Sequence, residues 1–215
     1  MTYAYDETYL DDAMNNLGDM FDYAVNDCGY EVNDFWDYFI VSGVSSAIEK
    51  GNPKYVAGLS GPELASEVLN RTFNTRPDTP PAYTVDKSPE YWAGWILAYY
   101  QWITKRSFTD MEKNALTIER VLSLYPTLHE ADVSKFVSVA DNIIAVNVNN
   151  SPSNLQRIRK ASGKTQKELA KASGVSLRMI QLYEQRQHDI NKMQAKKLQD
   201  LARSLGCSAE ALLEG

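Results

Sequence analysis

The sequence is poor in the residues that form cross-links and metal sites, and it has no long apolar run. Of its 215 residues only two are cysteines and two are histidines. Cys28 and Cys207 form no disulfide framework, and His129 has no cysteine or histidine at metal-ligand spacing. No apolar run approaches the roughly 18 residues of a membrane helix, and the acidic start lacks the apolar stretch of a signal peptide. These absences predict a cytoplasmic protein that contacts no membrane and holds no metal and no cofactor.

Signals of catalysis are missing too. The glycine-rich segment 51–61 lacks the Gly-Lys-Ser/Thr ending of a phosphate-binding loop. The neighbouring carboxylates of Asp11 and Asp12, and of Asp34 and Asp37, are typical of a solvated acidic helix face. Since no nucleophile stands beside a base, we expect no catalytic residue and no enzyme activity.

Charge divides the chain into two parts. Residues 1–150 carry 22 acidic and 10 basic residues, a net charge of −12, whereas residues 151–215 carry 6 acidic and 12 basic residues, a net charge of +6. Such asymmetry indicates two units with different partners. The basic unit is the candidate to face the phosphates of a nucleic acid.

Hydrophobic periodicity predicts helices throughout, so we expect an all-α protein. Helix starts are marked by Ser88-Pro89 and by capping boxes at 60–63 and 109–112, whose hydroxyl and carboxylate groups satisfy free backbone donors. Periodicity stops at the Asn-, Ser- and Pro-rich segment 147–152, which is typical of a linker, and Ser151-Pro152 is a good start for the next helix. We therefore predict an acidic helical domain at 1–146, a linker at 147–152 and a second domain at 153–215.

The second domain contains short helices with clear start and stop signals. Leu155 and Ile158 share one face of the first helix, and the segment 165–168 is a capping box for the second. Gly174 allows the tight turn that follows, because glycine tolerates a positive φ. Ser176 caps a third helix, and two more helices follow it.

This pattern resembles the Cro/C1-type (XRE) helix-turn-helix family over residues 153–214. The resemblance rests on residues at the spacing of that family: Leu155-x-x-Ile158-Arg159, Thr165-Gln166-x-Glu168-Leu169-Ala170, Gly174-Val175-Ser176, Ile180 and Glu184. It implies a five-helix, lambda-repressor-like domain whose partner is double-stranded DNA. It also implies a structural ion pair between Arg159 and Glu184.

The resemblance further assigns contacts with DNA. The third helix would lie in the major groove, with base-reading positions at Ser176, Leu177, Arg178, Gln181 and Leu182. Arg178 could pair with a guanine and Gln181 with an adenine. The residues expected to contact phosphates are Thr165, Gln166, Arg186, His188 and Lys192. Arg186 departs from the family, which often has glycine there, so the loop after the third helix could have a different shape.

The densest feature of the acidic domain is the aromatic segment Tyr91–Ile103. Apolar residues surround this predicted helix, which marks it as a buried core element. A ligand pocket is the alternative for its large aromatic residues, Trp92, Trp95, Tyr99 and Trp102.

Two roles stay open for the acidic domain. It would either form a homodimer, with or without a small-molecule effector, or capture a protein partner. In the first case the protein is a sequence-specific bacterial transcription regulator, a nucleoid-associated repressor that binds a palindromic operator as a dimer. In the second it is an antitoxin whose N-terminal domain binds a protein toxin and whose C-terminal domain represses its own operon, which is an analogy between arrangements.

Overall fold

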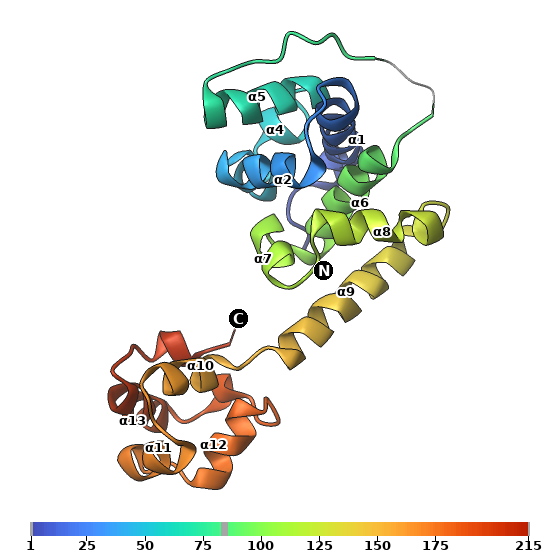
Figure 1. Ribbon diagram of the computed structural model, residues 1–215. Helices are drawn as coiled ribbons and strands as arrows, with labels where there is room; N and C mark the ends of the chain where they lie inside the picture. The colour runs from blue at the N-terminus through green and yellow to red at the C-terminus, as the bar shows by residue number, and fades with distance from the viewer. Residues whose placement is uncertain (1, 83–85, 215) are drawn as a thin grey trace. The chain divides into compact units, whose positions relative to one another are not determined.

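The structure is a computed structural model that describes residues 2–82 and 86–214 (Figure 1). The chain forms two compact units, Met1–Ala145 and Val146–Gly215. Both are built from helices, and no β-strand occurs in the part of the chain that the structure describes. The prediction of an all-α protein is therefore confirmed.

The N-terminal unit winds through short and medium helices before the long helix α9, which continues into the second unit. In chain order the elements are the 3-10 turn η1 (Glu7–Tyr9), α1 (Leu10–Asp22), the π-helical turn η2 (Tyr23–Asp27), α2 (Val32–Val41), α3 (Val44–Glu49), α4 (Pro53–Val56), α5 (Gly61–Phe73), α6 (Pro89–Thr104), α7 (Phe108–Lys113), α8 (Ile118–Leu128) and α9 (Val133–Asn150).

Helices α1 and α6 form the centre of this unit, and glycines allow their backbones to approach closely. A Cβ atom on Gly94 of α6 would lie 2.4 Å from the carbonyl oxygen of Leu17 in α1. A Cβ atom on Gly18 would lie 2.8 Å from the ring of Tyr91. Helix α6 is apolar on nearly all sides but has only 16 residues. None of the described helices is long and apolar enough to cross a membrane.

Of the three helix starts predicted in the N-terminal unit, two are confirmed and one is wrong. The capping box at Ser60 and Glu63 is present at the start of α5, and Ser88 caps α6. The box predicted at 109–112 is wrong, because α7 begins earlier, with Ser107 as its cap and the backbone N–H of Asp110 as donor at 3.0 Å. The earlier start places Phe108 inside the helix, where its side chain is fully buried.

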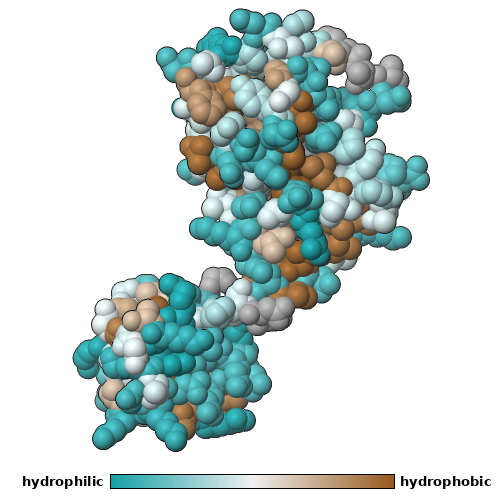
Figure 2. All heavy atoms as spheres, in the orientation of Figure 1, coloured by the Kyte–Doolittle hydropathy of each residue, from teal (hydrophilic) through white to brown (hydrophobic). Residues whose placement is uncertain are grey.

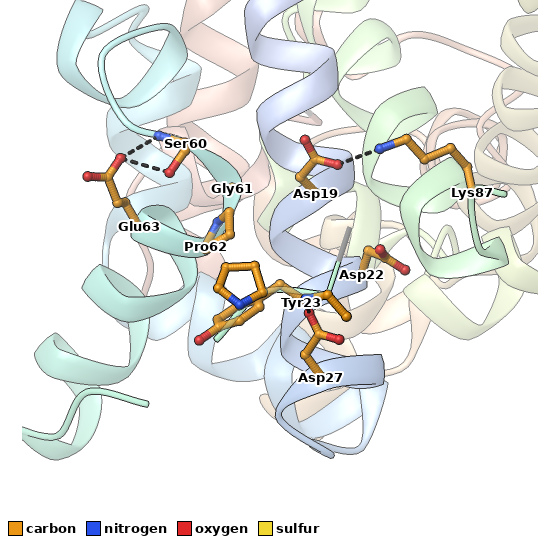
Figure 3. Close-up of a pocket in the computed structure, with 11 residues that line it drawn as sticks. Asp19, Asp22, Tyr23, Asp27, Ser60, Gly61, Pro62, Glu63 and Lys87 are labelled. Carbon is orange, nitrogen blue, oxygen red and sulfur yellow. Dashed lines mark hydrogen bonds and ion pairs between the residues drawn. The ribbon is translucent and has the colours of Figure 1, made fainter. Parts of the chain in front are cut away.

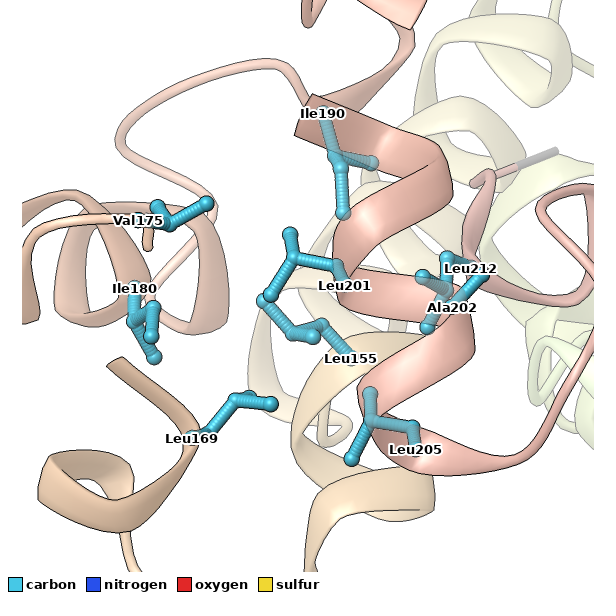
Figure 4. Close-up of a cluster of buried hydrophobic side chains, with 9 residues drawn as sticks. All are labelled: Leu155, Leu169, Val175, Ile180, Ile190, Leu201, Ala202, Leu205 and Leu212. Carbon is cyan, nitrogen blue, oxygen red and sulfur yellow. The ribbon is translucent and has the colours of Figure 1, made fainter. Parts of the chain in front are cut away.

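The C-terminal unit contains α10 (Asn154–Ala161), α11 (Gln166–Ser173), α12 (Leu177–Glu184), the 3-10 turn η3 (Ile190–Lys192), α13 (Ala195–Leu205) and the 3-10 turn η4 (Glu210–Leu212). The fifth predicted helix is thus a single 3-10 turn. One cluster of apolar side chains joins these elements (Figure 4): Leu155, Leu169, Val175, Ile180, Ile190, Leu201, Ala202, Leu205 and Leu212.

Helix α9 runs through most of the segment expected to be a linker. It ends at Asn150, so four of the six residues at 147–152 are helical. The next helix also starts later than predicted, because its cap is Ser153 and not Ser151, with the backbone N–H of Gln156 donating to Ser153 Oγ at 3.2 Å. Asparagine costs a helix no more than about 0.7 kcal/mol. Helix α9 is already held by three buried residues spaced one turn apart, Phe136, Ala140 and Ile144. It can therefore continue through several asparagines.

Candidate nucleic-acid interface

Local hydrogen bonds set the turn between α11 and α12. Gly174 ends α11 with a φ of 69°, in the left-handed region that favours glycine. Ser176 Oγ then accepts the backbone N–H of Met179 at 3.3 Å and caps α12. Val175 and Ile180 pack into the core beside Leu169 (Figure 4). The two helices are therefore oriented by their own caps and fixed by the core beneath them.

A buried polar network holds the end of α12 to α10 and α11. Arg159 Nε donates to Glu184 Oε1 at 2.5 Å, and Arg159 Nη2 donates to Glu184 Oε2 at 3.0 Å. The side chain of Glu184 is fully buried and that of Arg159 is 10% exposed. The hydrogen bonds to Glu184 raise the pKa of Arg159 above its usual value. Gln166 Nε2 adds a third donor to Glu184, at 2.8 Å. The ion pair implied by the resemblance is thus present, and it fixes the C-terminal end of α12 to α10.

The opposite face of α12 is accessible. Arg178 is exposed and forms no ion pair with any described residue, while Gln181 lies half-buried one turn later. Leu177 and Leu182 are also half-buried, and Ser176 is exposed at the start of the helix. Gln185, which no sequence motif indicated, is exposed and lies four residues after Gln181, so it extends the same face. The predicted base-reading residues thus keep polar groups available at the surface of one helix.

At the start of α11 the expected phosphate-binding side chains are already engaged. The Thr165 hydroxyl accepts the backbone N–H of Glu168, and the Glu168 carboxylate accepts the backbone N–H and the hydroxyl of Thr165, each at 2.8 Å. These bonds, chiefly the one from the backbone of Thr165, lower the pKa of Glu168. The amide of Gln166 is bound to Glu184. What remains for an anion is the exposed Thr165 and the positive end of the helix.

Arg186, a predicted phosphate contact, has its side chain engaged within the C-terminal unit. Its Nη1 donates to the carbonyl oxygens of Val148, at 2.5 Å, and of Ser151, and its Nη2 donates to Glu214 Oε2 at 2.9 Å. Val148 lies in the last turn of α9, where carbonyl groups have no intrahelical partner, so the guanidinium caps that end. The backbone of Arg186 has a φ of 54°. It keeps the left-handed conformation that glycine adopts easily, and the side chain holds the segments at 148–151 and 214 to the loop after α12.

The two remaining phosphate candidates are exposed. His188 lies in the loop after α12, with its ring 6.0 Å from that of Tyr183. Lys192 is 84% exposed and lies 3.4 Å from Asp189, a surface ion pair of little energetic weight. Both side chains can therefore reach a ligand without disrupting the core.

Exposed lysines supply most of the positive charge of this unit. Three of its arginines pair with acidic groups: Arg159 with Glu184, Arg186 with Glu214, and Arg203 with Asp200. By contrast, five lysines are exposed and form no ion pair within the described chain; these are Lys160, Lys167, Lys171, Lys196 and Lys197. Figure 2 shows a mostly hydrophilic face on this unit. Such a surface attracts a polyanion.

The four aromatic residues of α6 that were candidates for a ligand pocket pack at separate places along the helix. Trp92 packs against the rings of Tyr125 and Phe136, at 5.6 and 5.8 Å. Trp102, more than two turns later, stacks on Tyr3 at 3.9 Å with Tyr99 beside it at 6.0 Å. Trp92 and Trp102 are buried, and Trp95 and Tyr99 are half-buried. The ring contacts of Trp92, and those of Tyr99 and Trp102, are therefore packing contacts at two separate places.

A cavity of about 420 Å³ lies elsewhere in the N-terminal unit, between α1, η2 and the start of α5 (Figure 3). Its carboxylates are engaged: Asp19 pairs with Lys87 at 2.8 Å, and Glu63 belongs to the capping box of α5. Asp27 accepts the backbone N–H of Ala82 at 2.9 Å. Among the described residues, no group of His, Cys, Asp and Glu side chains could hold a metal ion. The lining residues come from distant parts of the chain, so the sequence contained no signal for this cavity.

Comparison with known proteins identifies the C-terminal unit. A family model described as helix-turn-helix matches residues 155–212, just over a quarter of the chain. No curated protein and no solved structure matches the chain. The C-terminal unit is therefore a helix-turn-helix domain, as the resemblance implied, and domains of this kind bind DNA in regulators of transcription.

Proposed function

We propose that this protein is a repressor that binds a palindromic operator as a dimer. The observation that carries the proposal is the outer face of α12, where Arg178 and Gln181 remain available while Glu184 is fixed below by Arg159. A rigid helix with free polar side chains suits the major groove. Two copies would place their α12 helices about 34 Å apart, one turn of DNA, and would double the contacts of a small domain.

In this proposal one set of side chains contacts the DNA bases and another contacts the DNA phosphates. Arg178 and Gln181 read base edges, while Leu177 contacts a thymine methyl group and Ser176 and Leu182 complete the helix surface. The positive end of α11 at Thr165 and the backbone of Gln166, together with His188 and Lys192, contacts phosphates. The phosphate contacts position the domain, and the base contacts supply the specificity.

The test is the substitution Arg178→Ala in the full-length protein. Loss of a bidentate contact with guanine should weaken binding to the preferred duplex by roughly 1–3 kcal/mol, or about 5- to 150-fold. Binding to unrelated duplexes should change little, because the exposed lysines remain. The measurement is fluorescence anisotropy, with an operator first selected from a random duplex library and titrated at several salt concentrations.

Arg203→Ala is the matched control, because it also removes one exposed arginine charge but lies at the end of α13, away from α12. It should leave the preference for the operator unchanged. An Arg178→Ala protein that still prefers the operator as strongly as the wild type would refute the assigned role. Absence of salt-dependent affinity for any duplex would refute DNA binding. A single protomer per operator in analytical ultracentrifugation would refute the dimer.

The antitoxin is the second candidate, and the acidic N-terminal unit is the observation that favours it. Residues 1–150 have a net charge of −12, which opposes contact with DNA and suits a basic protein partner. The two candidates share the helix-turn-helix domain. They differ in what the N-terminal unit binds.

A further inference from the structure

An exposed patch of the N-terminal unit lies where the ends of α2 and α5 meet. We call it the aromatic patch and define it by Tyr30, Tyr38, Val41 and Phe73. The rings of Tyr38 and Phe73 are in edge-to-face contact at 4.7 Å, and those of Tyr30 and Tyr38 lie 6.3 Å apart. Val41 lies three residues after Tyr38 on the same face of α2. The ring contacts and the position of Val41 one turn after Tyr38 therefore place the four residues on the same side of this unit.

The apolar part of the aromatic patch is open to solvent. Val41 is 71% exposed and Phe73 is 49% exposed, and they are two of the few large apolar side chains so exposed in the described chain. Figure 2 shows apolar residues at the surface of this unit. The hydroxyl groups of Tyr30 and Tyr38 donate no hydrogen bond to any other described residue. Both tyrosines are half-buried, and partly exposed aromatic side chains with free polar ends are typical of binding surfaces.

Exposed acidic residues lie along α2 beside the aromatic patch. The first 49 residues contain 11 acidic residues and no lysine or arginine. On α2 and at its cap, Glu31, Asp34 and Asp37 are exposed beside the patch. The nearby Arg71 is engaged, since it pairs with Glu67 at 2.9 Å and donates a hydrogen bond to the hydroxyl of Tyr55.

We propose that the aromatic patch binds a basic protein segment that presents an apolar side chain next to arginine or lysine. The apolar side chain would lie against Val41 and Phe73. Its cationic neighbours would pair with Asp34 and Asp37 and stack on the tyrosine rings. Charge selects this occupant: a nucleic acid, an anionic lipid surface or a second copy of the same acidic patch would each bring negative charge to negative charge. The inference does not depend on DNA binding, and it leaves dimerisation to another surface.

The probe is a fluorescein-labelled amphipathic peptide helix with leucine on one face and arginine on the other. A second peptide of the same pattern carries glutamate in place of arginine. Fluorescence anisotropy with the full-length protein should show saturable binding of the arginine peptide, weakening as salt is raised. The glutamate peptide should bind at least about tenfold more weakly.

Variants of the protein locate the binding. The double substitution Val41→Ser and Phe73→Ser should weaken binding at least about tenfold, because it removes the apolar anchor points. Asp34→Asn with Asp37→Asn should weaken binding and flatten its salt dependence. Val146→Ser removes an apolar side chain that is about as exposed as Phe73 but lies outside the patch, and this variant should bind as the wild type does. Circular dichroism checks that each variant is folded.

Three results would overturn the proposal. The first is no saturable binding of the arginine peptide up to about 1 mM. The second is binding that survives the serine substitutions or does not distinguish the two peptides. The third is a wild-type dimer that the serine substitutions convert to a monomer in sedimentation, which would make a second copy the occupant. Each of these results leaves the operator-binding test of Arg178 unaffected, so the two proposals fail separately.

Discussion

Removing Arg159 should destabilise the C-terminal unit far more than the loss of an ordinary surface ion pair. In an Arg159→Ala protein the carboxylate of Glu184, which is fully buried, keeps only the amide of Gln166 as a side-chain donor. Stranding a charge in this way costs about 3–5 kcal/mol. A unit of 70 residues, Val146–Gly215, has a total stability of roughly 3.5–10.5 kcal/mol at about 0.05–0.15 kcal/mol per residue. The substitution should therefore remove about half of it.

The assay is urea unfolding of the full-length protein followed by two probes. All four tryptophans, Trp36, Trp92, Trp95 and Trp102, lie in the N-terminal unit, so their fluorescence reports on that unit alone. Far-UV circular dichroism reports on the helices of both units. We expect a circular-dichroism transition that moves down by on the order of 2 M urea, with an unchanged fluorescence transition.

A double substitution is the control for this reasoning. Arg159→Met with Glu184→Leu replaces the ion pair by apolar groups and should return most of the lost stability, because no buried charge is left unpaired. If Arg159→Ala instead lowers stability by less than about 1 kcal/mol, the pair behaves as an exposed salt bridge does. The claim that it fixes the C-terminal end of α12 to α10 would then be refuted.

Two further predictions concern backbone geometry. Arg186→Gly relieves about 1 kcal/mol of left-handed strain but removes the hydrogen bonds to Val148 and Ser151 and the pair with Glu214. We expect a net loss of about 2 kcal/mol in the circular-dichroism transition, and a gain in stability would show that the side chain contributes less than its strain. Gly94→Ala places a Cβ atom 2.4 Å from the carbonyl oxygen of Leu17, so α1 and α6 must separate. We expect a loss of about 1–3 kcal/mol in the fluorescence transition, and an unchanged transition would show that the two helices are not tightly packed there.

The helix-turn-helix domain could be predicted from sequence because its signals are local. Thr165, Gly174 and Ser176 act on backbone groups within four residues of themselves, as caps and turn. Their spacing therefore reports directly on helix starts and ends. The ion pair of Arg159 and Glu184 spans 25 positions, and the resemblance to a family supplied it.

The differences arose where the outcome depends on which segments meet. The Asn-rich segment at 147–150 continues α9, because a helix already held by packing tolerates weak helix formers. The cap of helix α7, Ser107, lies two residues before the predicted box, since that start buries Phe108. Arg186 turns inward because the carbonyl ends of α9 and the Glu214 carboxylate lie within its reach.

For the N-terminal unit, local patterns predicted the helices, two of their starts, the buried character of α6 and the charge, but not how the helices pack. Composition alone distinguishes an acidic unit from a basic one, and periodicity alone distinguishes helix from strand, because both are properties of neighbouring residues. The aromatic patch depends on α2 and α5 ending side by side, and the separation of Trp92 from Trp102 depends on which helices cover each of them. Those arrangements belong to packing between segments tens of residues apart, which no short stretch of sequence encodes.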